Sequence, residues 1–182
     1  MSGPRLETGP ILTIGHSTHT LQEFIDLLHA HSVTLVVDIR TIPRSRHNPQ
    51  FNRETISDGL AEAGIAYLHM PDLGGLRHAS RDSPNTGWLN ASFRGFADYM
   101  QTQEFNEGLE KLIEIAKEKR LALMCAEAVP WRCHRSLIAD SLLIHGIPVE
   151  HIMNATSRLT HALTPWAKVE GARITYPKEQ AG

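Results

Sequence analysis

Long apolar runs, cysteines and an excess of charge of either sign are all scarce in this sequence. No stretch approaches the roughly 20 apolar residues that a membrane-spanning helix needs, and residues 1–8 lack the apolar segment of a signal peptide. Only two cysteines are present, which argues against a disulfide framework. The formal net charge of −2 argues against a strongly basic, non-specific nucleic-acid binder, although it is compatible with a local basic pocket. We therefore expect a cytoplasmic protein with no membrane partner.

The chain has 182 residues, of which 41% are apolar and 21% charged, as in ordinary globular proteins. This length suits one domain with one core, which we assign to residues 1–160. Residues 161–182 have weak periodicity and are predicted to form a tail packed on the domain or trailing from it. Eleven histidines is a high count, so histidine chemistry and metal binding both need to be considered.

Short apolar runs alternate with helical patterns along the chain. Strands are predicted at 11–14, 33–39, 65–70, 121–125 and 149–153, and helices after Thr20, after Asn52, at 93–100, from Thr102 and at about 132–145. This alternation predicts a single-domain α/β fold: a mostly parallel, five-stranded sheet with helices on both faces, a Rossmann-like three-layer α/β/α arrangement.

In such sheets ligands bind beyond the carboxyl ends of the strands. This rule brings residues from separate parts of the chain to one edge. The residues it selects are His16 and Ser17 after the first strand, Arg40 after the second, Asp72 after the third, and Cys125 and Glu127 after the fourth.

The segment from Cys125 to Arg135 is the strongest candidate for chemistry. Helix N-terminal amides and the charges of Arg132 and Arg135 would favour the Cys125 thiolate, and Glu127 could act as a general acid or base. Alternatively, Cys125 is a small buried apolar residue and Glu127 pairs with an arginine. Cys133 and His134 are expected in the first helical turn. We assign Cys133 to core packing, whereas His134 either reaches the sheet edge or is a hydrogen-bonded core histidine.

Three further segments suit an anionic ligand. Arg40, Arg44, Arg46 and His47 lie within eight residues and suit phosphate or carboxylate recognition, unless they form a solvated loop. Residues 15–18 could hold an anion with amides and hydroxyls, or simply form a capped turn. Residues 72–77, with a charged residue at each end, could form a lid, or their glycines could serve turns.

Two other chemistries fit less well. A zinc site using Cys125, Cys133, His134 and His16 is conceivable, but the spacing matches no ordinary zinc finger. The loop of cysteine-dependent phosphatases has an arginine six positions after the cysteine, where this chain has Trp131. Glu127 would also repel a phosphate dianion, and Pro130 has no amide donor. We therefore assign no phosphatase chemistry, no metal and no cofactor.

Several separated motifs resemble the bacterial and archaeal family called domain of unknown function 488 (DUF488). They lie at residues 13–17, 37–40 with Pro43 and Ser45, 73–77, 93–100, 123–127 and 133–135. The resemblance implies a small α/β fold and leaves the activity open.

Together these features predict an enzyme that acts on an anionic substrate, such as a nucleotide or nucleic-acid component. Arg40, Arg44 and Arg135 would hold the anion, with Ser17, Asp72, Arg77, Arg132 and His134 as further binding residues. Cys125, with Glu127 and His16, would carry out transfer or hydrolysis. The alternatives are a non-catalytic ligand-binding module in which Cys125 is structural, and a zinc site.

Overall fold

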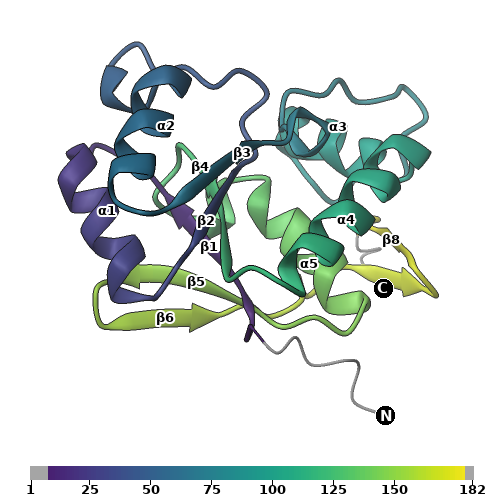
Figure 1. Cartoon of the computed structure of the whole chain (residues 1–182). Coiled ribbons are helices and arrows are strands. Elements are labelled where there is room, and N and C mark those ends of the chain that lie inside the picture. Colours follow the sequence, from purple (N-terminus) through teal and green to yellow (C-terminus); the bar gives the residue numbers. More distant parts are fainter. Residues whose placement is uncertain (1–7, 179–182) are drawn as a thin grey trace.

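The structure is a computed structural model and describes residues 8–178, which form a central sheet with helices on both faces (Figure 1). The strand order in the sheet is β3-β2-β4-β1-β5-β6. The first five strands of the chain pair in parallel, and β6 is antiparallel to β5. The strands are β1 (Ile11–Gly15), β2 (Leu35–Asp38), β3 (Ala66–His69), β4 (Leu121–Cys125), β5 (Val149–Asn154) and β6 (Ser157–Thr160).

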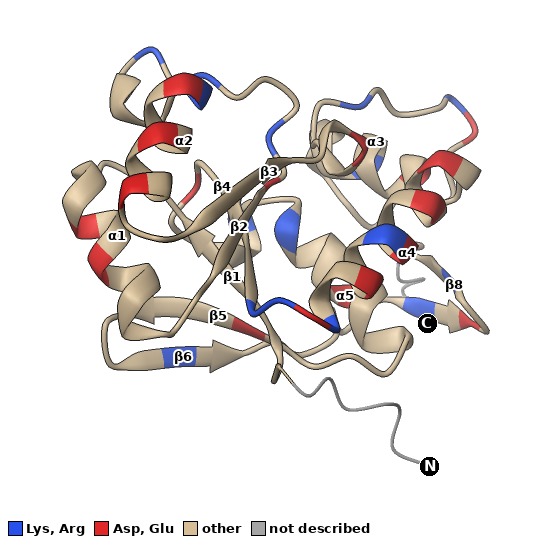
Figure 2. Cartoon of the chain, viewed as in Figure 1, with Lys and Arg blue, Asp and Glu red and all other residues tan. Residues whose placement is uncertain are grey.

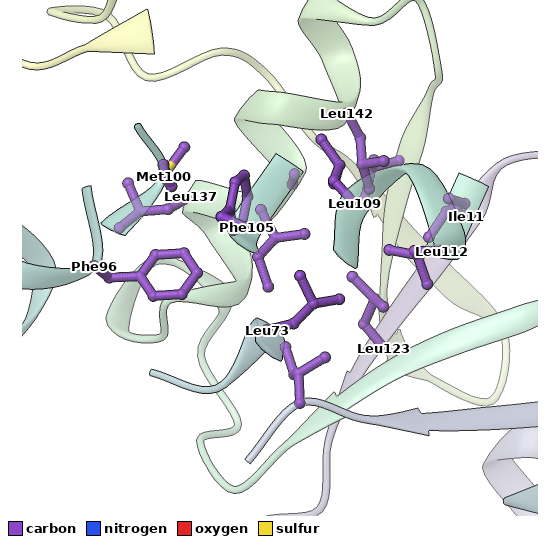
Figure 3. Close-up of a cluster of buried hydrophobic side chains, with 14 of the residues drawn as sticks. Ile11, Leu73, Phe96, Met100, Phe105, Leu109, Leu112, Leu123, Leu137 and Leu142 are labelled. Carbon is purple, nitrogen blue, oxygen red and sulfur yellow. The ribbon is translucent and has the colours of Figure 1, made fainter. Parts of the chain in front are cut away.

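The five α-helices form two layers. Figure 1 shows α1 (Leu21–Ala30) and α2 (Arg53–Glu62) on one side of the sheet, and α3 (Ala91–Tyr99), α4 (Gln103–Ala116) and α5 (Arg135–Ile144) on the other. Each layer encloses its own cluster of buried apolar side chains. Figure 3 shows the larger cluster, to which α4 contributes Leu109 and Leu112, α5 contributes Leu137 and Leu142, and β4 contributes Leu123. The predicted three-layer α/β/α fold is therefore confirmed.

The helix starts follow their capping residues. Thr20 and Glu23 form a reciprocal capping box at α1, and the Thr102 hydroxyl accepts a hydrogen bond from the Phe105 amide at α4. Asn52 precedes α2 as predicted, but its side chain accepts a hydrogen bond from the amide of Ser45, 2.8 Å away. Asn52 therefore fixes the arginine-rich connection between β2 and α2.

The helix expected from about residue 132 begins at Arg135 instead. Pro130 opens a separate short 3-10 turn, η3 (Pro130–Arg132), which the Cys133 amide closes by donating to the Pro130 carbonyl. Cys133 then adopts an extended conformation with φ −127° and ψ 147°. Cys133 therefore lies before the helix, and its side chain is free to face the end of β4.

The expectation of five strands was also wrong, because β6 adds a sixth. The segment is short, all four of its residues are exposed, and it lies at the edge of the sheet, so it lacks the apolar signal of a buried strand. A separate hairpin, β7 (Lys168–Glu170) and β8 (Arg173–Thr175), turns at Gly171, whose φ is +63°. Ile174 of β8 and Tyr176, just after it, are buried in the larger cluster. Within residues 8–178, no helix combines the length and apolarity needed to cross a membrane.

Candidate functional site

A cavity of about 340 Å³ opens beyond the carboxyl ends of β2 and β4. Its lining comes from the connections that follow these strands, from the segment before α5, from residues 75–76 and from the start of α3. Six of the predicted site residues line it, together with Cys133. The lining includes Arg40, Arg44, Cys125, Glu127, Arg132, Cys133 and His134.

The two cysteines meet at the inner end of this cavity. Their Sγ atoms lie 2.8 Å apart, and the side chains are only 3% and 6% exposed. The Cys125 end of β4 is fixed by its neighbour β1, because Gly15 lies opposite Cys125 and the His16 amide donates to the Cys125 carbonyl. The sheet therefore sets the position of Cys125, and the turn at Pro130 brings Cys133 to it.

Arg135 supplies the positive charge next to the thiol pair. Its side chain is fully buried, and its Nη1 donates to the Cys125 Sγ at 2.8 Å and to the Glu127 carbonyl. Its Nη2 donates to the Ala128 carbonyl at 3.0 Å. One guanidinium thus both contacts the sulfur and folds the loop after β4. Arg132, which is nearer to the position of a phosphatase arginine, is exposed and lies at the cavity wall.

The loop held by Arg135 packs closely on the end of β1, and this requires glycine at position 15. A Cβ atom there would lie 1.9 Å from the Glu127 carbonyl oxygen, far inside van der Waals contact. The Ser17 amide donates to the Ala126 carbonyl at 2.9 Å on the same side. The glycine predicted for an anion-binding turn therefore serves the close approach of two strand ends.

The surroundings of the two thiols move their pKa values in opposite directions. Burial by itself raises the pKa of Cys125, but the hydrogen bond from Cys133 and the charge and hydrogen bond of Arg135 outweigh burial and lower it to about 7. Burial and the neighbouring Cys125 raise the pKa of the Cys133 thiol. Cys125 therefore ionises before Cys133, which donates its S–H to the Cys125 sulfur.

Arg40 lines the cavity, but most of its guanidinium is already paired. Its Nε and Nη2 donate to the two carboxylate oxygens of Asp38 at 2.9 and 2.7 Å, and its Nη2 also donates to the Phe51 carbonyl. The Tyr67 hydroxyl donates to the same carboxylate. The Arg40 Nη1 is buried and has no partner within the described part of the chain. Arg40 can therefore offer one N–H group to a ligand, with its charge largely balanced by Asp38.

His134 is held in its neutral form at the cavity wall. Its Nε2 donates to the carbonyls of Ile39 and Leu73, each 3.0 Å away. Burial lowers the pKa of His134 to about 4. Its Nδ1 lies 3.5 Å from the Cys133 Sγ. Glycine is required at position 75, because a Cβ atom there would lie 2.6 Å from this Nδ1. His134 thus joins the ends of two connections and contacts the thiol pair.

Arg44, Arg132 and Glu127 supply the exposed charges of the cavity. Neither arginine forms an ion pair within residues 8–178. The connection that carries Arg44 contains basic residues and no acidic ones, and in Figure 2 it is tan with blue segments and no red. An anion entering the cavity would therefore meet two unpaired guanidinium groups at its entrance.

Besides Arg135, which lies behind Cys125, four predicted site residues do not line the cavity. His16 is buried, stacks on Phe51 at 4.3 Å and donates from Nδ1 to the Ser17 carbonyl. Ser17 has a φ of 47° in the turn after β1. Asp72 is exposed beside α4. The Arg77 guanidinium stacks over Tyr99 at 3.6 Å and donates to two carbonyls of its own loop.

The site also contains residues that sequence reasoning assigned elsewhere or missed. Cys133 was assigned to packing, and the signal that could have placed it was Pro130, which favours a turn before the helix. Ile42 and Leu76, which line the cavity with 59% and 66% of their surface exposed, gave no periodic signal in their loops. Within the described residues, no three His, Cys, Asp or Glu side chains are grouped to hold a metal ion.

The family model for domain of unknown function DUF488 matches residues 20–142, which is more than half of the chain. The chain belongs to the DUF488 family. Comparisons with curated proteins and with solved structures find no match. The matched DUF488 region includes Arg40, Arg44, the two cysteines and Arg135, so the cavity lies within the part of the chain that defines the family.

Proposed function

We propose that this DUF488 domain is a thiol-dependent enzyme that transfers or hydrolyses a group of an anionic substrate, with Cys125 as the nucleophile. The observation that carries the proposal is the contact between the Arg135 Nη1 and the Cys125 Sγ, 2.8 Å long, at the wall of a cavity. A buried guanidinium next to a sulfur stabilises the thiolate, which is the nucleophilic form of cysteine.

The reaction needs only a thiolate and a positioned electrophile. The Cys125 sulfur would form a bond to the electrophilic atom of the substrate, and the bond from that atom to the leaving group would break with its electron pair. Water or a second acceptor would then attack the same atom and release the group, restoring the thiolate. Glu127 is exposed in the cavity lining, and in this proposal its carboxylate would accept the proton of that water.

The entrance of the cavity favours a substrate with an anionic group and an apolar or planar portion. Arg44 and Arg132 would hold the anion, and Ile42, Leu76 and Phe93 line the same space. A nucleotide has both parts and is the substrate class that we propose; Arg44 and Arg132 would hold its phosphate, which would not enter the loop after Cys125, where Glu127 would repel it. His16 lies behind the strand end, so we propose that it positions the loop instead of exchanging protons with substrate.

The first test compares two alkylating reagents that differ in charge. Iodoacetate carries a carboxylate and iodoacetamide is neutral, so the ratio of their rates at Cys125 measures attraction of anions to the thiol. We expect this ratio to fall by about 3- to 10-fold in Arg132→Ala, because one unpaired charge near the sulfur is lost. Arg46→Ala is the matched control, since Arg46 is exposed on the same connection as Arg44 but does not line the cavity.

The second test concerns the substrate class. AMP should raise the melting temperature of the protein more than adenosine does, and Arg132→Ala should reduce that difference. If Cys125 is alkylated no faster than a model thiol at neutral pH, the proposed enzyme is excluded. A shift with AMP in that case would identify the cavity as a non-catalytic binding site.

A further inference from the structure

The proposed group transfer gives the second thiol, Cys133, no reactive role. That reaction needs Cys133 only as a hydrogen-bond donor. The Cys133 Sγ nevertheless lies 2.8 Å from the Cys125 Sγ, so the sulfurs would need to approach by only about 0.8 Å to reach a disulfide bond length. Both residues also line the cavity, where a small oxidant can reach them.

The two sulfurs are chemically unequal. Cys125 accepts from the Arg135 guanidinium, whereas Cys133 accepts only from the Arg135 backbone amide, at 3.4 Å. An unequal pair suits two successive steps, in which one sulfur is oxidised as the thiolate and the other attacks it. The polypeptide between them is anchored by Arg135 through the carbonyls of Glu127 and Ala128. Those anchors do not depend on the charge of Cys125, so the loop stays in place when the thiolate is consumed.

We propose that Cys125 and Cys133 form a redox pair that reduces a hydroperoxide and closes to an intramolecular disulfide. This activity goes beyond the proposed group transfer and does not rest on it. The Cys125 thiolate attacks the terminal oxygen of the hydroperoxide, an S–O bond forms, the O–O bond breaks, and the alcohol leaves after taking a proton.

The second step joins the sulfurs. Cys133 attacks the sulfur of the Cys125 sulfenic acid, the S–S bond forms, the S–O bond breaks, and hydroxide leaves with the Cys133 proton as water. The two thiols lose two electrons, and the hydroperoxide gains them. A thiol or dithiol reductant returns the pair to its starting state.

Hydrogen peroxide is the probe for the test. The reduced full-length chain is mixed with an equimolar amount at neutral pH, and its intact mass is measured. We expect the protein to lose the mass of two hydrogen atoms. Trypsin cleaves after Arg120, Arg132 and Arg135, so the peptide 121–132 should be recovered linked to the peptide 133–135.

The chain has only these two cysteines, so each single variant isolates one thiol. Cys133→Ser should stop at the sulfenic acid, gain one oxygen at Cys125 and be trapped by dimedone. Cys125→Ser should consume peroxide at least about 10-fold more slowly, because Cys133 lacks the guanidinium contact.

Two results would overturn the redox pair: a wild-type chain that keeps two free thiols under peroxide that oxidises a model dithiol, or equal peroxide rates in the two variants. The wild-type measurement stands even if a variant does not fold. Alkylation of Cys125 by iodoacetamide, without oxidant, tests the proposed group transfer separately. Fast alkylation with no disulfide would overturn only the redox pair, and a disulfide with slow alkylation would overturn only the group transfer.

Discussion

Helix α5 contributes to two buried polar clusters that differ in how completely their atoms are paired. Its first residue, Arg135, belongs to the thiol cluster, which we define as Cys125, Cys133 and Arg135. Asp140, one and a half turns later, belongs to the carboxylate cluster, which we define as Asp140, His161, His151, Thr13, Thr164 and Tyr176. The thiol cluster is buried, and so is the carboxylate cluster except for the half-buried His161 and Thr164, but only the thiol cluster adjoins the cavity with the free arginines.

Every polar side chain of the carboxylate cluster has a partner. The Asp140 carboxylate accepts from His161 at 2.8 Å, from the Tyr176 hydroxyl at 2.8 Å, and from both the hydroxyl and the amide of Thr164. His151 donates from Nε2 to the Nδ1 of His161 and accepts from the Thr13 hydroxyl at its own Nδ1, so one direction of donation serves the whole chain of bonds. This cluster ties residues 161–176 to α5 and to the sheet.

The carboxyl edge of the sheet is paired less completely. Among the described residues, the His16 Nε2, the Arg40 Nη1 and the Arg135 Nε are buried without a partner. Leaving a buried polar atom unpaired costs about 1–3 kcal/mol, so a fold retains such atoms where they serve another purpose. We infer from the adjoining cavity and its free arginines that the thiol cluster is the reactive one, whereas the fully paired carboxylate cluster holds residues 161–176 to the rest of the domain.

Replacing Arg135 should break the thiol cluster and have the largest effect on reactivity. In Arg135→Met the thiol stays buried but loses the positive charge, so the pKa of Cys125 rises from about 7. We expect alkylation by iodoacetamide at pH 7 to slow on the order of 50-fold, because the thiolate fraction falls. The pH dependence of the alkylation rate measures this change directly.

Arg46→Met is the matched control for Arg135→Met, since Arg46 is exposed and does not line the cavity. It should keep the pH profile of the wild type. Arg135→Lys serves if Arg135→Met does not fold, because it keeps the charge while losing hydrogen bonds. An unchanged profile in a folded Arg135→Met protein would show that the guanidinium does not stabilise the thiolate.

Replacing Asp140 should greatly lower the stability of the fold and leave the reactivity of Cys125 unchanged, the opposite of replacing Arg135. In Asp140→Asn the amide presents N–H groups to hydroxyl and imidazole donors that need an acceptor. We expect unfolding to become easier by about 2–3 kcal/mol, measured by chemical denaturation. The alkylation pH profile of Cys125 should remain that of the wild type, and a shifted profile would show that the clusters are coupled through α5.

The sequence predicted which residues lie at the carboxyl edge of the sheet better than it predicted the contacts between them. The apolar runs at 11–14 and 121–125 are sufficient to place Gly15 and Cys125 at neighbouring strand ends, because parallel strands end on the same edge. The partner of a guanidinium is decided by tertiary packing. Arg40 turns back onto Asp38, only two residues earlier, where the Phe51 carbonyl also accepts from its guanidinium and the Tyr67 hydroxyl donates to the same carboxylate.

The same distinction explains His16 and Cys133. A strand-end histidine has the same local pattern whether it faces a cavity or stacks on a ring 35 positions away, as His16 does on Phe51. The start of α5 differs from prediction by three residues, yet that shift turns Cys133 from a helix-packing residue into a neighbour of Cys125. Periodicity describes one face of an element, and it does not resolve the residue at which the element begins.

Lowering the pH should reduce the stability of the fold by a smaller amount than replacing Asp140 does. The effect comes from His151 in the carboxylate cluster and from His134 beside the thiol cluster. Burial lowers the pKa of His151 to about 3 and that of His134 to about 4, below their ordinary value of 6.5. The folded state therefore keeps both rings neutral, whereas the unfolded chain takes up protons below pH 6.5. Stability is complete above that pH and is lost as the pH falls toward 4 and then 3.

Each histidine should remove about 2 kcal/mol of stability between pH 6.5 and pH 5. Denaturation at both pH values measures the loss. His151→Gln and His134→Gln should each reduce the slope of stability against pH, since glutamine does not titrate. A slope that neither variant changes would show that other groups are responsible for the acid sensitivity.

Removing the Thr13 hydroxyl should give the smallest effect and test whether complete pairing of the carboxylate cluster matters. Thr13→Val keeps the shape of the side chain on β1 but leaves the His151 Nδ1 without its donor. We expect a loss of about 1 kcal/mol in the free energy of unfolding, and Thr13→Ser, which keeps the hydroxyl, should lose less than Thr13→Val. The pKa of His151 would rise toward its ordinary value only if a water molecule replaced the hydroxyl beside the ring. The pH dependence of the stability of Thr13→Val would reveal such a rise. If Thr13→Val is as stable as the wild type, this end of the cluster tolerates an unpaired nitrogen, and complete pairing no longer separates the structural cluster from the reactive one.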